Sequence, residues 1–525
     1  MVTLFQRMKQ HDRQDGDRRQ GGEDQCNQEQ YPTADERTRL LPRETGQYLS
    51  PDDPAVSPYN LWSIRALRAL STTFLAISFI WWTFLLVSLF VSAPALHTRG
   101  SGFFAFAYTT LTVGYLLFGI IFFAVPSKPM TVWGLVLALF LFIDMCITVG
   151  VPRIRVEEGW VGIATVVWAT LIAFYNILQN RLVAWGKREE EERLTGREET
   201  RRSLREWLAV LAETLFMAII AIISILFMIT LALRARDATL QPPGEKYYVS
   251  AHNYQVHLDC VGNSTSDKSG PTVLIEAGEG PVEHTLQPFI DELHQRGAVP
   301  RYCYWDRPGF AWSDSAPSPF SAGMASDALS EALALAGEEG PWVIVSAGIG
   351  SIYSRIFASR HLLEVNGIFL IDPVHEDYLS DVGGPGRGFG LWIRGILSPL
   401  GIDRVLGAIF KHRTREDRVF GRSAYQTGKY IRAKLQENLV AGSMTSSEIQ
   451  AARHVQMADT PLVVVSSGIE VRKNGKWADR QEDLTGITKN LKHWDIVKGA
   501  PHEVWKTTEG RRILEERLRA MVSEK

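Results

Sequence analysis

The chain has 525 residues, a formal net charge of −2, 46% hydrophobic residues and 22% charged residues. A near-neutral charge gives no basic field, so nucleic-acid binding is not expected. The four cysteines form no CxxC motif and no metal-ligand spacing, which argues against a zinc site and a disulfide scaffold. No metal and no cofactor are predicted.

The first 60 residues are rich in Gln, Asp, Arg, Gly and Pro and poor in aliphatic side chains. Such a segment cannot bury enough apolar surface to offset its ordering entropy, so residues 1–60 are predicted to be a disordered cytosolic tail. No cleavable signal peptide is visible. The stretch from Glu36 to Leu40 and Leu41 resembles an acidic dileucine signal that directs membrane proteins to the lysosome or vacuole. A chance match is the alternative interpretation.

A membrane region is predicted over residues 61–236. Crossing a bilayer takes about 20 apolar residues in a helix, and five runs meet that length. They are apolar on all sides, whereas helices of a soluble core are amphipathic. The predicted partner is therefore the lipid membrane. The five runs are residues 70–92, 103–125, 130–150, 160–180 and 207–233.

The distribution of basic residues predicts the orientation, because Lys and Arg gather on the cytosolic side. The tail and the loop between the fourth and fifth runs are much more basic than the other loops. A cytosolic N-terminus and five spans place the C-terminal domain in a lumen, where the sequon at Asn263 is usable for N-glycosylation. One miscounted span would reverse this. A vacuolar or other endomembrane is expected, with the mitochondrial membrane as the alternative.

Two polar features accompany the spans. Asp144 lies within the third run. A hydrogen bond from Asp144 to a neighbouring helix, near Asn176, is preferred over a functional role, because the spans contain no relay of further acids around it. Residues 181–206 mix Arg with Glu and are predicted to form a solvated helix that extends the fourth span.

Residues 237–525 show short apolar runs that alternate with helical stretches. This alternation predicts a mostly parallel sheet with helices on both faces, and its functional site lies at the carboxyl ends of the strands. About 85 residues separate the runs GIFLID and PLVVVS, far more than a usual loop, so residues 375–455 are predicted to form an inserted helical cap.

The motifs of this region resemble the α/β-hydrolase superfamily, in its esterase and lipase-like branch. The whole layout is similar to fungal integral membrane proteins of unknown function. The resemblance implies a nucleophile on a sharp strand-to-helix turn, an acid, and a histidine late in the chain. It rests on IEAGEGP (275–281), DRPGFAWSD (306–314), PWVIVSAGIGSIYSRIFASRH (341–361), LIDPVHED (370–377) and GAPHEVW (499–505).

The nucleophile position of this pattern is Gly348, which has no side chain and cannot attack a substrate. Ser346 and Ser351 are weak substitutes, because one lies at the strand end and the other on the first helical turn. The structural alternative is that glycine relieves the strain of the turn.

The other parts of the pattern are present. His502 matches the histidine and Asp372 the acid, with Glu470 as the alternative acid. The backbone N–H groups of Glu279 and Ile349 match the oxyanion hole. A structural role is the alternative for each side chain.

Two further expectations follow from the resemblance. Cys260 and Cys303 lie on neighbouring strands, so an oxidising lumen permits a disulfide, but two buried free thiols are expected. In the cap, Trp392 and Ile396 line a lipophilic pocket, lie against a membrane surface, or pack on the core.

Three functions remain open. The first is a non-hydrolytic module that binds a lipophilic small molecule or a protein partner of unknown identity. The second is a hydrolase of lipophilic esters or lipids that uses Ser346 or Ser351 with His502. The third places the function in the membrane helices, with the domain as an appendage.

Overall fold

The computed structural model describes residues 59, 61–196, 204–262, 270–456 and 458–523. The tail, its dileucine pattern and the Asn263 sequon lie outside the described residues. From Ser50 onward the chain forms one compact unit, so the long helices and the α/β domain contact each other.

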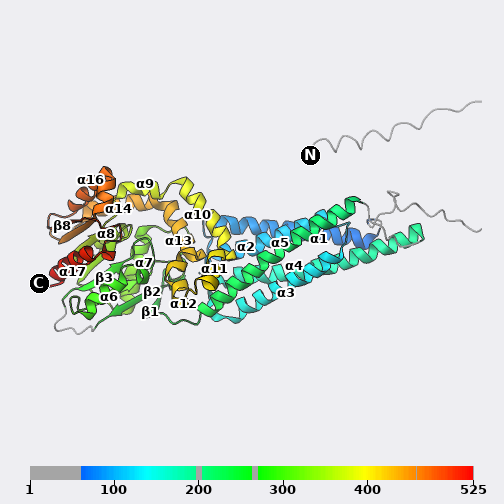
Figure 1. The fold of residues 1–525 in the computed structure, drawn as a ribbon, viewed down its shortest axis with the longest axis horizontal. Coiled ribbons are helices and arrows are strands. Elements are labelled where there is room, and N and C mark those ends of the chain that lie inside the picture. Colours follow the sequence, from blue (N-terminus) through cyan, green and yellow to red (C-terminus); the bar gives the residue numbers. More distant parts are fainter. Residues whose placement is uncertain (1–58, 60, 197–203, 263–269, 457, 524–525) are drawn as a thin grey trace, which may run out of the picture. The chain divides into compact units, whose positions relative to one another are not determined.

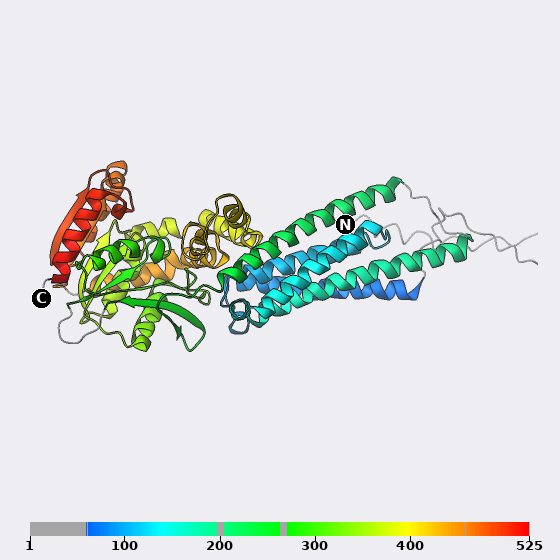
Figure 2. The ribbon, with the colours of Figure 1, turned by 60° about the horizontal axis from the view of Figure 1, so that its bottom comes forward.

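Five of the described helices are long and apolar enough to cross a membrane, as the sequence predicts. The first begins at Trp62 rather than near residue 70, because Arg65 and Arg68 lower the hydropathy of its opening turns. The fourth departs from helical geometry at Gly159 and extends well past its apolar run. They are α1 (Trp62–Ser88), α2 (Phe103–Ile121), α3 (Lys128–Gly150), α4 (Pro152–Thr195) and α5 (Leu204–Asp237) (Figures 1 and 2).

Asp144 of α3 makes the interhelical hydrogen bond that its burial requires. The Tyr108 hydroxyl of α2 donates to its carboxylate at 2.7 Å, and Asp144 is fully buried. The partner is therefore Tyr108, whereas the sequence pointed to the neighbourhood of Asn176. A neutral hydroxyl donor lets a carboxyl group remain inside an apolar bundle.

The C-terminal domain is built on an eight-stranded sheet of order β1-β2-β4-β3-β5-β6-β7-β8. Only the pairs β1–β2 and β2–β4 are antiparallel, and the others are parallel. This is the α/β-hydrolase fold that the motifs predict. The strands are β1 (Glu245–Val249), β2 (Tyr254–Val261), β3 (Thr272–Glu276), β4 (Tyr302–Trp305), β5 (Trp342–Ala347), β6 (Val365–Ile371), β7 (Leu462–Ser467) and β8 (Leu491–Val497).

Both faces of the sheet are covered, so its central strands are apolar at successive positions. Val273 and Ile275 of β3 face one core, which α6 (Gln287–Gln295) and α17 (Thr508–Ser523) complete. Leu274 faces the other core, with α7 (Ala322–Ala336), α8 (Gly350–Arg360) and α16 (Gly475–Thr485). The two-residue period of a strand produces this division.

The predicted cap lies between β6 and β7, and it contacts the ends of the membrane helices as well as the sheet domain. In Figure 1 its helices α10 to α13 lie beside the ends of α2 and α5. Pro399 and Gly401 separate α10 from α11, as the sequence predicts. The cap helices are α9 (Leu379–Val382), α10 (Pro385–Leu397), α11 (Ile402–Phe410), α12 (Arg415–Val419), α13 (Gly428–Val440) and α14 (Ser446–Val455).

The expectation of two free thiols at Cys260 and Cys303 is wrong, because these residues form a disulfide. They are direct partners in the antiparallel pair β2–β4, with Cα atoms 4.0 Å apart. Side chains at directly opposed positions of an antiparallel pair project on the same face of the sheet, which brings the two sulfur atoms together.

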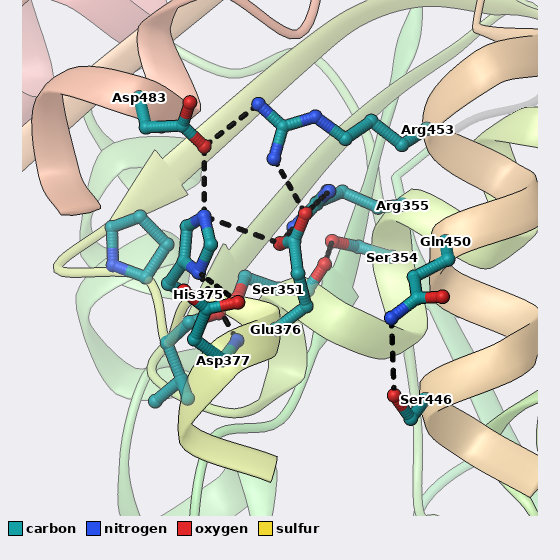
Figure 3. A network of polar contacts seen from close by, with 12 residues as sticks. Ser351, Ser354, Arg355, His375, Glu376, Asp377, Ser446, Gln450, Arg453 and Asp483 are labelled. Carbon is teal, nitrogen blue, oxygen red and sulfur yellow. Dashed lines mark hydrogen bonds and ion pairs between the residues drawn. The ribbon is translucent and has the colours of Figure 1, made fainter. Parts of the chain in front are cut away.

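A buried ion-pair network attaches the first residues of the cap to the core (Figure 3). Arg355 of α8 donates to Glu376 at 2.7 Å, and both side chains are at least nine-tenths buried. Arg453 of α14 also donates to Glu376, at 2.6 Å, and it bridges to Asp483 at 2.7 Å. The network therefore ties α8, α14 and α16 to the first residues of the cap.

We expect Arg355→Met to destabilise the full chain by about 1–3 kcal/mol, because Glu376 would lose its fully buried partner and keep only the partly exposed Arg453. The double variant Arg355→Met/Glu376→Met should recover most of this loss, since it also removes the buried carboxylate while Arg453 keeps its pair with Asp483. The apparent melting temperature of the full chain in detergent measures both effects. A double variant no more stable than the single one would contradict the prediction.

Candidate functional site

The candidate site lies at the carboxyl ends of β3, β5, β6 and β8, as expected for a parallel sheet. Gly348 stands on the turn between β5 and α8, with φ of +52°. Its N–H donates to the Ile371 carbonyl at 3.1 Å, which fixes the turn against β6. The turn thus has the left-handed conformation of a strained strand-to-helix elbow, with a glycine at its apex.

His502 and Asp372 lie together, as the motif pattern predicts. The His502 Nδ1 atom lies 2.6 Å from Asp372 Oδ2, and Asp372 is fully buried. The other oxygen of Asp372 accepts hydrogen bonds from the Ser467 N–H at 3.0 Å and the Trp477 ring N–H at 3.1 Å. Glu470, the alternative acid, instead pairs with Lys473 at 3.3 Å.

Glu279 places its side chain, as well as its backbone, in this site. Its carboxylate accepts a hydrogen bond from the Ile349 N–H at 3.2 Å and lies 3.4 Å from His502 Nε2. A Cβ atom built on Gly348 would lie 2.5 Å from Glu279 Oε1 and 2.8 Å from His502 Nε2. The carboxylate therefore lies next to the empty nucleophile position and takes one of the predicted oxyanion donors.

The charges of this group change the proton affinity of the histidine. Burial alone would lower the pKa of His502, but its hydrogen bonds to Asp372 and Glu279 and their negative charges raise it to about 10. Burial would raise the pKa of Glu279, but His502 and, more weakly, the Ile349 N–H lower it to about 2. Near neutral pH the site is thus an imidazolium held between two carboxylates.

Ser346 and Ser351 both have other hydrogen-bond partners. The Ser346 hydroxyl lies 2.8 Å from the Ser354 hydroxyl, and Ser351 donates to the Val374 carbonyl at 3.1 Å. Both residues are fully buried. Figure 3 shows Ser351 and Ser354 beside the Arg355–Glu376 pair.

The cap holds the loop that carries Glu279. The Tyr430 hydroxyl of α13 donates to the Glu279 backbone carbonyl at 2.6 Å. Tyr425 approaches Gly280 so closely that a Cβ atom there would lie 1.8 Å from its hydroxyl. Only glycine, which has no Cβ atom, leaves room for Tyr425 here. Half of the Glu279 side chain nevertheless remains exposed, so a ligand in the cleft has access to it.

Trp392 and Ile396 pack elsewhere. They join a cluster with Leu85, Leu89 and Phe103 of the membrane helices, and the Trp392 ring lies 6.4 Å from that of Phe90. Packing against the ends of the spans was not among the three alternatives that the sequence offered for these two residues.

Two groups of metal-ligand side chains lie within 4.8 Å among the described residues. In the first, Cys260 and Cys303 are joined in the disulfide and offer no thiolate. In the second, with Glu283 and Asp306, His257 already uses both ring nitrogens, at 2.9 Å from Asp306 and 2.5 Å from the Pro243 carbonyl. Neither group presents a complete set of free ligand atoms.

The side chain of Glu279 is the feature that sequence reasoning missed. Only its backbone N–H was assigned, because the motif pattern specifies a backbone donor at that position. A charged residue there, combined with glycine at the elbow, is the signal that could have indicated a carboxylate beside the empty nucleophile position.

Comparison with known proteins finds a family model and fungal relatives. A family model described as a region of unknown function (DUF2417) matches residues 36–260. An uncharacterised protein of Schizosaccharomyces pombe is 34% identical over 520 residues, which cover 92% of this chain and 96% of the relative. An uncharacterised vacuolar membrane protein of Saccharomyces cerevisiae is 27% identical over 386 residues, covering 62% of this chain and 60% of the relative.

Solved structures similar to this chain include an alpha/beta hydrolase enzyme from a deep-sea metagenome library, at 11% identity and a TM-score of 0.40. It covers 54% of this chain and 98% of that structure. The enol-lactonase from Burkholderia xenovorans is 12% identical, with a TM-score of 0.37, and covers 53% of this chain and all of that structure.

The raised pKa of His502 predicts a pH dependence of stability. The folded value of about 10 exceeds the ordinary value of 6.5. The stabilisation is therefore complete below the ordinary pKa and is lost as the pH rises through the folded pKa. The difference in apparent melting temperature between wild type and His502→Gln should be largest near neutral pH and below, and vanish at about pH 11. His454→Gln, at an exposed histidine, is the control, and a difference that stays constant with pH would contradict the prediction.

Proposed function

Since the chain belongs to one family with the uncharacterised Schizosaccharomyces pombe protein, we propose that it is a multi-pass membrane protein whose α/β-hydrolase-fold domain binds without hydrolysing. The observation that carries this proposal is the Glu279 carboxylate beside Gly348. The domain then acts as a ligand-binding or interaction module attached to the membrane.

Two physical arguments oppose serine-type hydrolysis at this site. A general base must accept a proton from the nucleophile, and the raised pKa of His502 keeps the ring protonated near neutral pH. An oxyanion hole must offer free N–H donors to the developing negative charge, and the Ile349 N–H already donates to Glu279. The resident carboxylate thus occupies groups that the reaction requires.

A displaced serine has less support. Ser346 and Ser351 are fully buried, and their hydroxyls are hydrogen-bonded to Ser354 and to the Val374 carbonyl. Nucleophilic catalysis requires the hydroxyl within hydrogen-bond reach of the base, and His502 already has Asp372 and Glu279 as partners.

Labelling of the full chain with a fluorophosphonate probe tests the proposal. Wild type should label no faster than His502→Ala. Gly348→Ser restores a nucleophile, but its Cβ atom must displace the Glu279 carboxylate. We therefore expect Gly348→Ser/Glu279→Ala to label at least about tenfold faster than Gly348→Ser, because the charge-assisted hydrogen bonds of Glu279 no longer compete.

The matched control is Gly348→Ser/Glu470→Ala, which removes a carboxylate that pairs only with Lys473. It should label like Gly348→Ser. Labelling of the wild type that His502→Ala abolishes would overturn the non-hydrolytic proposal and favour a displaced serine, which mapping of the labelled peptide would identify.

We further propose a vacuolar membrane location with the N-terminus in the cytosol and the α/β domain in the lumen. The Saccharomyces cerevisiae relative is described as a vacuolar membrane protein, which supports the organelle. The disulfide between Cys260 and Cys303 supports an oxidising compartment for the domain, since such bonds are rare in the cytosol. The basic loop between α4 and α5 supports a cytosolic N-terminus.

Protease protection in intact vacuoles tests this topology. An N-terminal tag should be digested while a C-terminal tag is protected, and endoglycosidase should shift the gel mobility of the wild type but not of Asn263→Gln. Digestion of the C-terminal tag in intact organelles would place the domain in the cytosol and contradict the proposal.

A further inference from the structure

A cavity of about 110 Å³ lies where the ends of the membrane helices meet the cap. The cavity volume is several times that of one water molecule, which is about 30 Å³ in the liquid. In Figures 1 and 2 the cap helices lie beside the ends of α2 and α5, where this cavity is found. It is separate from the His502 site, whose residues do not line it.

The wall of the cavity carries more positive than negative charge. Arg153, Arg234, Arg404, Arg418 and Lys429 line it, against the carboxylates of Glu157 and Asp237. The excess of cations persists when Glu158, which pairs with Arg234 at 2.6 Å, is included.

These few carboxylates are shared among several cations. Glu157 lies 2.9 Å from Arg234, 3.5 Å from Lys429 and 3.6 Å from Arg153. The single negative charge of Glu157 cannot balance the three positive charges around it. The wall therefore has capacity for a further anion.

Arg404 is the least compensated of these groups. It is 7% exposed, its nearest carboxylate is Asp237 at 3.4 Å, and its Nε atom has no hydrogen-bond partner among the described residues. Asp237 is already engaged by Arg418 through Nε at 2.9 Å and through a second nitrogen at 2.5 Å. Burial, together with the weaker effects of the Arg234 and Arg418 charges, lowers the pKa of Arg404 to about 10 despite the opposing charge of Asp237.

A helix N-terminus adds to this field. Thr427 caps α13, and Gly428 and Lys429 of its first turn line the cavity. The first N–H groups of a helix have no intrahelical acceptor and carry a partial positive charge, so they favour a phosphate-type anion.

Part of the wall is apolar and belongs to the membrane helices. Phe104 of α2 and Phe227 and Leu231 of α5 form it. An occupant thus meets two kinds of surface: guanidinium groups, from the cap and from the ends of α4 and α5, and hydrocarbon from the spans. A free anion would use only the first of these surfaces, whereas an anionic lipid would use both.

We propose that this cavity binds the phosphate headgroup of an anionic membrane lipid, with Arg404 as its principal donor. The planar guanidinium presents paired N–H donors that match two phosphate oxygens. Phe104, Phe227 and Leu231 then contact the part of the lipid next to its headgroup. This inference is independent of the proposal for the His502 site.

The test uses the full chain, purified in detergent and stripped of lipid. Its apparent melting temperature is measured with dioctanoyl phosphatidic acid, dioctanoylglycerol or inorganic phosphate. We expect phosphatidic acid to raise it clearly more than the other two. Titration should show that Arg404→Gln weakens binding of phosphatidic acid roughly ten- to hundredfold, the range expected for charge-assisted hydrogen bonds.

Arg404→Gln should not lower the melting temperature without lipid, because it removes a cation that lacks a full partner. Arg404→Lys, which keeps the charge but not the paired donors, should bind with intermediate affinity and serves if the glutamine variant does not fold. Arg422→Gln, at an exposed arginine of the cap, is the matched control and should bind like the wild type.

Three results would overturn the proposal. They are an equal effect of dioctanoylglycerol, an unchanged affinity for phosphatidic acid in both Arg404 variants, and a full effect of inorganic phosphate alone. The last would assign the cavity to a soluble anion.

Discussion

The contact between the Glu279 carboxylate and His502 governs the chemistry of the α/β domain. It lies in the space beside residue 348, so glycine fits there without displacement of the carboxylate. It also keeps the imidazole charged, which gives the buried Asp372 a cationic partner. The retained histidine and acid are therefore explained as parts of an ion-paired structure, and their presence is not by itself evidence of catalysis.

The buried positive charges of this chain are compensated to different degrees at two places. At the His502 site, one cation lies between two carboxylates and is fully compensated. At the junction with the spans, five cations share three carboxylates, and the Nε atom of Arg404 has no hydrogen-bond partner among the described residues. A buried charge without a partner is costly, so the first arrangement is complete in itself, whereas the second is suited to an external anion.

The fold was predictable from the sequence to a greater extent than the site. Apolar run length predicts the five spans, and the alternation of apolar runs with helical stretches predicts the sheet. The long segment between GIFLID and PLVVVS predicts the cap, and the motif order predicts the pairing of His502 with Asp372. The role of the Glu279 side chain was not predictable, because it depends on the distance between two loops far apart in the chain. The Cys260–Cys303 bond was missed for a related reason: strand adjacency was predicted, but the register that opposes the two residues was not.

Helix α13 brings the two sites within one turn of each other. Lys429 lines the cavity beside the spans, and Tyr430, the next residue, holds the loop of Glu279. A rigid helix cannot shift one of these contacts without the other. An occupant of the cavity that shifts α13 therefore also shifts the Glu279 loop. By thermodynamic linkage, a ligand at the Glu279 loop has the same effect on binding in the cavity. Under the proposed lipid binding, the composition of the bilayer and the state of the neighbouring cleft are coupled through this helix.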